Sequence, residues 1–138
     1  MDEALLARYQ AGQVASDNPD YLGRELYRAV YRDLLQMRVA LREQRWDRLT
    51  NKGSHAQWII TGLHDNALAG TREGEMFRIT HRHLWQLLNQ VMAEHREEAL
   101  ASLEAFITDF IHQLDARLEQ SREGATAVVA GGRTEWTG

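Results

Sequence analysis

The residues best suited to bind a metal are six histidines, and one of them has a ligand-like spacing to an acid. Asp109 and His112 form a carboxylate-x-x-His element of the kind that di-iron helical bundles use. Such a site needs this element twice, and the chain has one copy. The chain has no cysteine, which excludes thiolate zinc and iron–sulfur sites. We therefore expect no metal and no other cofactor, and we expect His81, in phase with Phe77 and Leu84, to be a hydrogen-bonded histidine between helices.

Nucleophilic catalysis also lacks a matching arrangement in the sequence. A serine nucleophile needs a positioned base and donors that stabilise an oxyanion. The serines stand in predicted turns or on polar helix faces, away from such groups: Ser16, Ser54, Ser102 and Ser121. The phosphate-binding pattern G-x-x-x-x-G-K is missing as well. The sequence therefore predicts that the chain is not an enzyme.

One carboxylate, Asp33, falls inside an apolar helix face. A buried carboxylate needs a partner, because burying an isolated charge is very costly. We expect an arginine from another helix to pair with Asp33. A catalytic role would need a second acid placed to help it, and the sequence places none.

The elements that position these residues are all predicted to be helices. The chain has a single proline, Pro19, and from Tyr21 to about Gln120 apolar residues recur at helical spacing. We predict an all-α, antiparallel four-helix bundle, with a short helix or cap segment at Asp2–Ala11 before it. The four helices are expected at about 19–44, 46–64, 75–95 and, after a charged connection at 94–98, up to about 120.

Two regions of this pattern are ambiguous. Asn51–Ser54 resembles a turn, and Ser54 with Gln57 makes a capping box, but the apolar face keeps its phase across Gly53. We therefore favour one continuous second helix. After Ser121 the apolar pattern stops and glycines become frequent. This predicts one bundle domain over 1–120 and a flexible tail over 121–138.

The first long helix carries an unusually wide apolar surface. Its apolar residues cover an arc of roughly 240°, whereas a helix on the outside of a small bundle needs about 100°. Leu26 lies in the central stripe of this arc, and Tyr27, Tyr31 and Leu35 widen it. The arc indicates either several neighbouring helices or a surface for a partner, and tyrosine suits both.

Charge and hydropathy argue against nucleic acid and membrane spans. Twenty acidic residues oppose sixteen basic ones. The first helix carries a row of arginines that is interrupted by acids, so we interpret it as a solvated face and not as a phosphate-binding stripe: Arg24, Arg28, Arg32, Arg38 and Arg42. No segment approaches the roughly 20 apolar residues of a membrane span, and the acidic first residues are not typical of a secretory signal. We expect a cytoplasmic protein.

Short motifs along residues 9–120 resemble those of the flagellin export chaperone family (FliS). They follow the family's order along the chain: Tyr9-Gln10, Val14–Pro19, Leu26-Tyr27, Ala56–Ile60 with Leu63, Gly74-Glu75 and Leu84-Trp85. The resemblance implies a chaperone that binds the carboxy-terminal helical segment of flagellin and prevents its premature polymerisation before export. It also implies that the segment with Tyr9 covers part of the groove when no client is bound.

The partner-binding residues expected from this resemblance and from the first-helix arc are Tyr9, Gln10, Leu26, Tyr27, Tyr31, Ile60 and Leu63. The alternative is another helical-bundle secretion chaperone or assembly adaptor with a different protein client. A homodimer that hides the same apolar surface is a further alternative.

Overall fold

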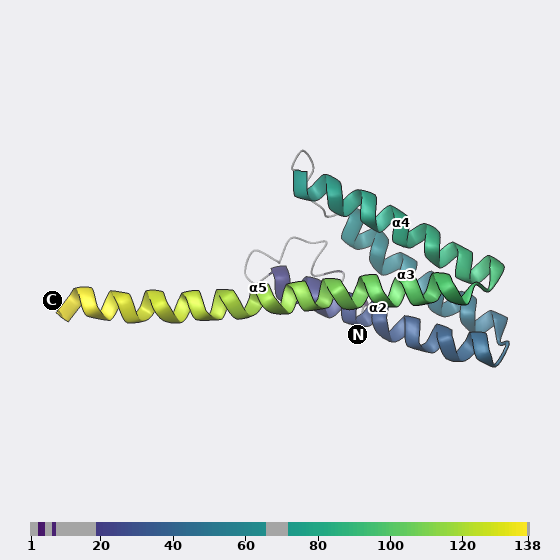
Figure 1. Ribbon diagram of the computed structural model, residues 1–138, viewed down its shortest axis with the longest axis horizontal. Coiled ribbons are helices and arrows are strands. Elements are labelled where there is room, and N and C mark those ends of the chain that lie inside the picture. The colour runs from purple at the N-terminus through teal and green to yellow at the C-terminus, as the bar shows by residue number, and fades with distance from the viewer. Residues whose placement is uncertain (1–2, 5–6, 8–18, 66–71, 138) are drawn as a thin grey trace.

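The computed structural model is all-helical over the residues it describes, which are 3–4, 7, 19–65 and 72–137. Side chains are described for 3–4, 7, 20–65 and 74–122. Four long helices follow one another: α2 (Pro19–Arg42), α3 (Trp46–Asp65), α4 (Arg72–Glu94) and α5 (Glu97–Thr137). They run alternately up and down (Figure 1), which confirms the predicted antiparallel four-helix bundle. Most of the predicted short helix at Asp2–Ala11 lies outside the described residues.

Two tight turns close one end of the bundle, and each contains a residue with a left-handed backbone. Gln44, between α2 and α3, has φ 56°, and His95, between α4 and α5, has φ 54°. A left-handed residue just after a helix is a common way to end it. The imidazole of His95 stacks on the indole of Trp46, with ring centroids 3.8 Å apart and planes 5° apart. This contact joins the two turns.

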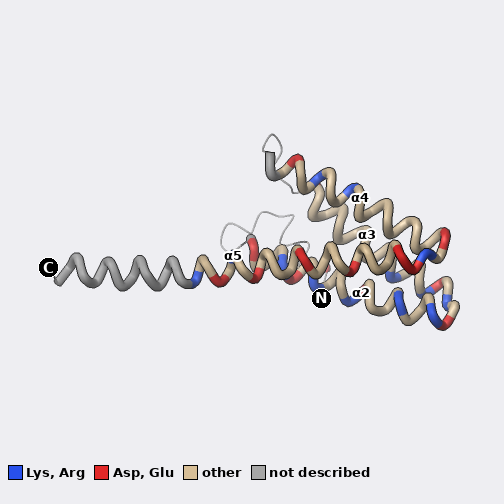
Figure 2. The backbone as a smooth tube through the Cα atoms, in the orientation of Figure 1, with Lys and Arg blue, Asp and Glu red and all other residues tan. Residues whose placement is uncertain are grey.

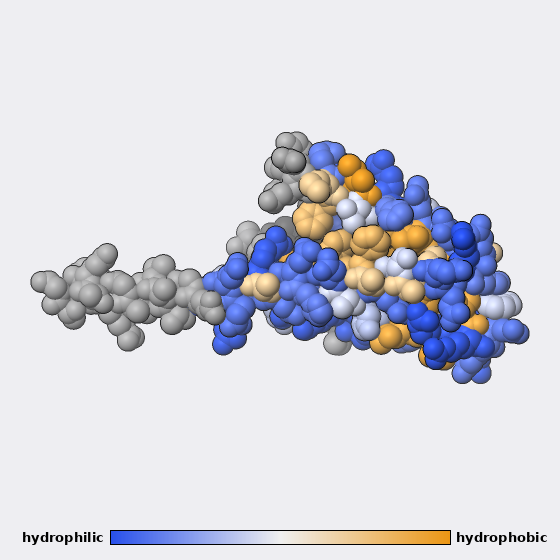
Figure 3. Space-filling model, in the orientation of Figure 1, coloured by the Kyte–Doolittle hydropathy of each residue, from blue (hydrophilic) through white to orange (hydrophobic). Residues whose placement is uncertain are grey.

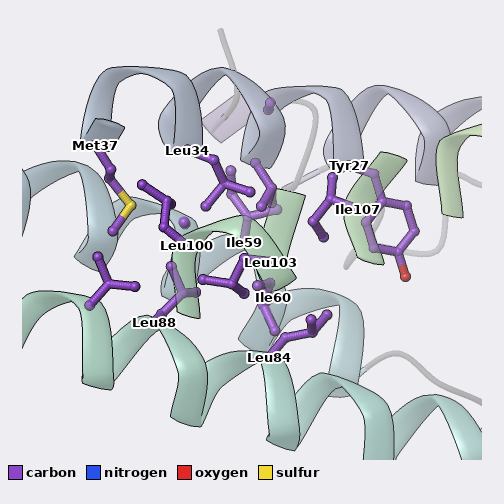
Figure 4. Close-up of a cluster of buried hydrophobic side chains, with 14 of the residues drawn as sticks. Tyr27, Leu34, Met37, Ile59, Ile60, Leu84, Leu88, Leu100, Leu103 and Ile107 are labelled. Atoms are coloured by element: carbon purple, nitrogen blue, oxygen red, sulfur yellow. The ribbon is translucent and has the colours of Figure 1, made fainter. Parts of the chain in front are cut away.

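Each helix packs against two neighbours within the described part of the chain. α2 and α4 each contact α3 and α5, and the α4–α5 contact is the least extensive of the four. Figure 1 shows the reason: α4 and α5 are close at the last turns of α4 and diverge toward its first turns. Apolar side chains from all four helices meet in the centre (Figure 4): Leu34, Ile59, Ile60, Leu84, Leu88, Leu100 and Leu103.

α3 is continuous across Gly53, as the phase of its apolar face predicted. Gly53 is buried, and a Cβ atom built there would lie 2.5 Å from the sulfur of Met92 on α4. The glycine therefore permits close packing of α4 on α3, although glycine costs about 1 kcal/mol in helix propensity relative to alanine. The turn-like composition of Asn51–Ser54 reflects this packing and not a break.

α5 continues to Thr137, so the predicted helix end near Gln120 is wrong. The prediction relied on the apolar periodicity, which stops after Leu118. That periodicity reports contact with neighbouring helices, whereas helix formation needs only compatible residues and no proline. α5 extends past the ends of the other helices in Figure 1, where such contacts are absent. The division into a domain over 1–120 and a flexible tail over 121–138 stays a prediction.

Candidate partner-binding surface

The residues that the sequence singled out for partner binding lie mostly in the core. Leu26, Tyr27, Ile60 and Leu63 are all buried in one cluster, and Tyr31 is half-buried against it. Tyr9 and Gln10 lie outside the described residues. The wide apolar arc of α2 is largely used by its two neighbours, α3 and α5. The binding role of these residues stays a prediction, and of the four buried ones Ile60 lines a pocket that is open to solvent.

A cluster of four rings fills the space where α4 leans away from α5. Tyr27 contacts Phe110 and His81, with ring centroids 5.2 and 6.0 Å apart, and Phe77 lies 5.8 Å from His81. The Tyr27 hydroxyl is 2.7 Å from Nε2 of the buried His81. Burial, with a smaller effect of His64, lowers the pKa of His81 to about 4. The expectation of a hydrogen-bonded histidine between helices is confirmed.

Asp33 is buried, as its place in the apolar arc predicted, and it pairs across helices. Its Oδ2 atom lies 2.6 Å from Nδ1 of His55 on α3. Within the described part of the chain, a histidine pairs with Asp33 where an arginine was expected. The reason is geometric, because Asp33 faces α3, whereas the arginines Arg24 and Arg38 reach toward α5.

Ion pairs between α2 and α5 form a seam along the two helices. Figure 2 shows where basic (blue) and acidic (red) residues lie along the backbone. Arg24 donates to Asp115 and Arg38 donates to Glu104, each over 2.8 Å. From the other side, Arg117 of α5 donates to Asp20 of α2 over 2.8 Å. The hydrogen bond with Glu104, opposed by burial, raises the pKa of Arg38 above its usual value. Arg24 and Arg38 therefore join two helices, whereas a solvated face was expected for this row of arginines.

Large apolar side chains are exposed on α2, where Tyr21, Leu35 and Val39 are 48%, 45% and 48% exposed, and also on α4 and its neighbours. Met76 and Ile79 on α4 are 61% and 65% exposed. Trp85 on α4, Trp58 on α3 and Phe106 on α5 are also exposed, and Phe106 meets the edge of His83 on α4. We call these five residues the α4 surface. Figure 3 shows apolar side chains collected over the first half of α4 and beside α5.

A pocket of about 150 Å³ opens between α3 and α4, and we call it the α3–α4 pocket. It is lined by Ile60, Thr61, His64, His81, Arg82 and Trp85. Next to it, the Gln57 amide donates to the Trp85 carbonyl and to Oδ1 of Asn89, which ties α3 to α4. Ile60 and His81 are buried, whereas Thr61 and Arg82 are exposed, so the pocket has a buried floor and an accessible rim.

The described residues contain no group of three or more His, Asp or Glu side chains that could hold a metal. Asp109 instead accepts a hydrogen bond from the Gln113 amide over 3.0 Å, and His112 is exposed. Within the same described residues, no helix is both long and apolar enough to cross a membrane.

The sequence reasoning missed the α4 surface because it looked for surplus apolar area on α2. Met76 and Ile79 do widen the apolar face of the third predicted helix, so a signal was present. The structure shows that these two side chains are mostly exposed. In comparisons with known proteins, no family model matches the chain and no curated protein matches it.

Proposed function

We propose that this chain is an export chaperone of the flagellin type, which covers the carboxy-terminal helical segment of a flagellin in the cytoplasm until export. The client is proposed from the order of motifs along residues 9–120 that resemble the flagellin export chaperone family. The binding mode is proposed from the structure alone.

The observation that carries the proposal is the α4 surface. Met76 and Ile79 are large apolar side chains that are mostly exposed on α4, and Trp85, Trp58 and Phe106 are exposed on α4, α3 and α5. Large apolar side chains left in water favour an interaction site, because burying them would be favourable. A helix that exposes an apolar stripe binds such a surface well, and flagellin helices before assembly are of this kind.

The rest of the described structure supports a binding protein. The titratable groups in the core are engaged in pairs between helices, His81 with Tyr27 and Asp33 with His55. Both pairs join helices and help to fix the positions of α3 and α4 relative to α2.

A binding experiment with a peptide that covers the carboxy-terminal helices of flagellin tests the proposal. We expect the wild type to bind the peptide and to delay flagellin polymerisation in light scattering. Ile79→Asp with Phe106→Asp should weaken binding by tenfold or more, because it places charges in the apolar contact. Val39→Asp is the matched control, since Val39 is an apolar residue of α2 that is 48% exposed and lies outside the α4 surface.

Absence of binding by the folded wild type would refute flagellin as the client. The alternative, a chaperone of another secreted helical protein, would then be the better explanation of the α4 surface. Equal binding by the wild type and the Ile79→Asp, Phe106→Asp variant would refute the α4 surface as the contact.

A further inference from the structure

We propose that the α3–α4 pocket binds one apolar side chain of the client helix, and that Arg82 and Arg78 beside it bind a client carboxylate one helical turn away. This inference rests on the proposed function and names the anchor by which the client is recognised. It predicts a client motif in which a large apolar residue has Asp or Glu at three or four positions from it.

The size and lining of the pocket define the apolar part of this motif. A volume of about 150 Å³ suits a single leucine, methionine or phenylalanine side chain, since an engineered apolar cavity of about this volume in another protein holds one benzene molecule. Ile60 forms the buried floor, and the Trp85 indole is 40% exposed beside it. Anchors in such pockets carry a large share of binding energy because they become fully desolvated.

The positive charges at the rim of the pocket define the acidic residue of the client motif. Arg82 lines the pocket, and Arg78 stands four residues before it on α4, one turn away. Neither arginine has an ion-pair partner among the described residues. Nε of Arg78 is buried and has no hydrogen-bond acceptor there. Two like charges at this spacing repel each other, so a bound carboxylate would be favourable.

The acids close to this rim do not neutralise it. Asp65 lies 3.3 Å from Nδ1 of His64, and its side chain is 63% exposed. Glu75 precedes Arg78 by one turn on α4 and is exposed without a described ion pair to it. The pocket therefore presents an apolar floor with a basic rim, which complements an amphipathic helix whose apolar face borders on acids.

The experiment measures the affinity of the flagellin carboxy-terminal peptide by fluorescence anisotropy for variants at the pocket. Thr61→Trp fills the mouth from an exposed position, and we expect at least a tenfold loss of affinity. The matched control is Thr50→Trp, an exposed threonine on the same helix outside the pocket lining, which should bind like the wild type. Circular dichroism at 222 nm verifies that both variants are folded.

A charge exchange tests the acidic half of the motif. Arg82→Glu should reduce affinity about three- to tenfold at low salt and flatten its salt dependence. Arg48→Glu, an exposed arginine in the first turn of α3, serves as the control. Replacing the client acid nearest the anchor by lysine should reverse the preference, so that this peptide binds the Arg82→Glu variant more tightly than the wild type.

Two results would overturn the inference while leaving the proposed function intact. One is full-affinity binding of the peptide by Thr61→Trp, and the other is the same loss of affinity in Thr50→Trp as in Thr61→Trp. If the wild type itself does not bind the peptide, the proposed function and the inference fail together.

Discussion

α2 and α4 are both arginine-bearing helices with an apolar stripe, and the bundle uses them differently. The arginines of α2 meet acids on α5, so that Arg24 and Arg38 each make an ion pair over 2.8 Å. On α4, Arg78 and Arg82 meet no acid among the described residues. The apolar side chains divide less sharply, because Met76 and Ile79 of α4 are the most exposed of them but Leu35 and Val39 of α2 are exposed as well.

The same kinds of residue therefore stabilise the fold at one place and remain accessible to solvent at another. α2 uses Arg24, Arg38 and much of its apolar stripe in contacts between helices. A helix that leans away from one neighbour keeps part of both in solvent. The contrast between the α2–α5 seam and the α4 side leads to four predictions.

The largest difference between α2 and α4 is expected in the free energy of unfolding when an apolar side chain is truncated to alanine. Leu34→Ala on α2 should lower the free energy of unfolding by about 2–5 kcal/mol, because Leu34 is fully buried and a cavity would remain. Ile79→Ala on α4 should stay within about 0.5 kcal/mol of the wild type, since the side chain is mostly hydrated already. Urea unfolding at neutral pH measures both. A large loss for Ile79→Ala would show that α4 is covered in solution.

Lowering the pH should decrease the free energy of unfolding, because His81 on α4 is buried in its neutral form. Its pKa is lowered to about 4 in the fold against 6.5 for the free side chain. Between these values the unfolded chain binds a proton that the folded chain does not, so stability falls as the pH drops from about 6.5 to about 4. The loss is roughly 3 kcal/mol for this group, and it levels off below the lower pKa.

A variant without the titrating group isolates this contribution. Tyr27→Phe with His81→Phe replaces both hydrogen-bond partners by rings of similar shape, which costs little. Urea unfolding of the wild type and this variant at pH 7, 6, 5 and 4 should show a smaller loss of stability in the variant. Identical pH curves would mean that His81 is not buried as described.

Salt should weaken the α2–α5 seam and leave the α4 side unaffected. A double-mutant cycle with Arg38→Met and Glu104→Gln should give a coupling of about 1 kcal/mol or less at low ionic strength, decreasing in 1 M salt. Arg82→Met should show no comparable salt-dependent change in stability, because no described carboxylate pairs with it. Equal salt effects on the two sides would contradict the division.

The smallest effects on stability are expected from glycine substitutions in the two turns, and these effects should differ between Gln44 and His95. Gln44→Gly should raise the free energy of unfolding by about 0.5 kcal/mol, because glycine adopts the left-handed backbone more easily. His95→Gly relieves the same strain but loses the stacking of His95 on Trp46, so we expect no gain in stability. Thermal unfolding followed by circular dichroism would detect the difference. A gain of the same size at both positions would argue that the stacking contributes nothing.

Much of the fold could be predicted from residues whose effect is local. The absence of proline after Pro19 and the apolar spacing predicted the four helices, and the phase across Gly53 predicted a continuous α3. The burial of Asp33 and His81 also followed from their places on apolar faces. The histidine partner of Asp33 did not follow, because it depends on which helices lie next to each other. The end of α5 was misplaced because apolar periodicity reports contact with neighbours and not helix formation itself.

Residue types and their spacing along the chain were enough to predict the helices and their amphipathic faces, because these are local properties. The pairing of charges depends on packing between helices. Arg24 and Arg38 meet acids because α5 lies beside α2, whereas Arg78 and Arg82 have no ion-pair partner among the described residues. The amphipathic face of one helix does not say which helix lies beside it or how close it comes, and here α4 and α5 diverge toward the first turns of α4.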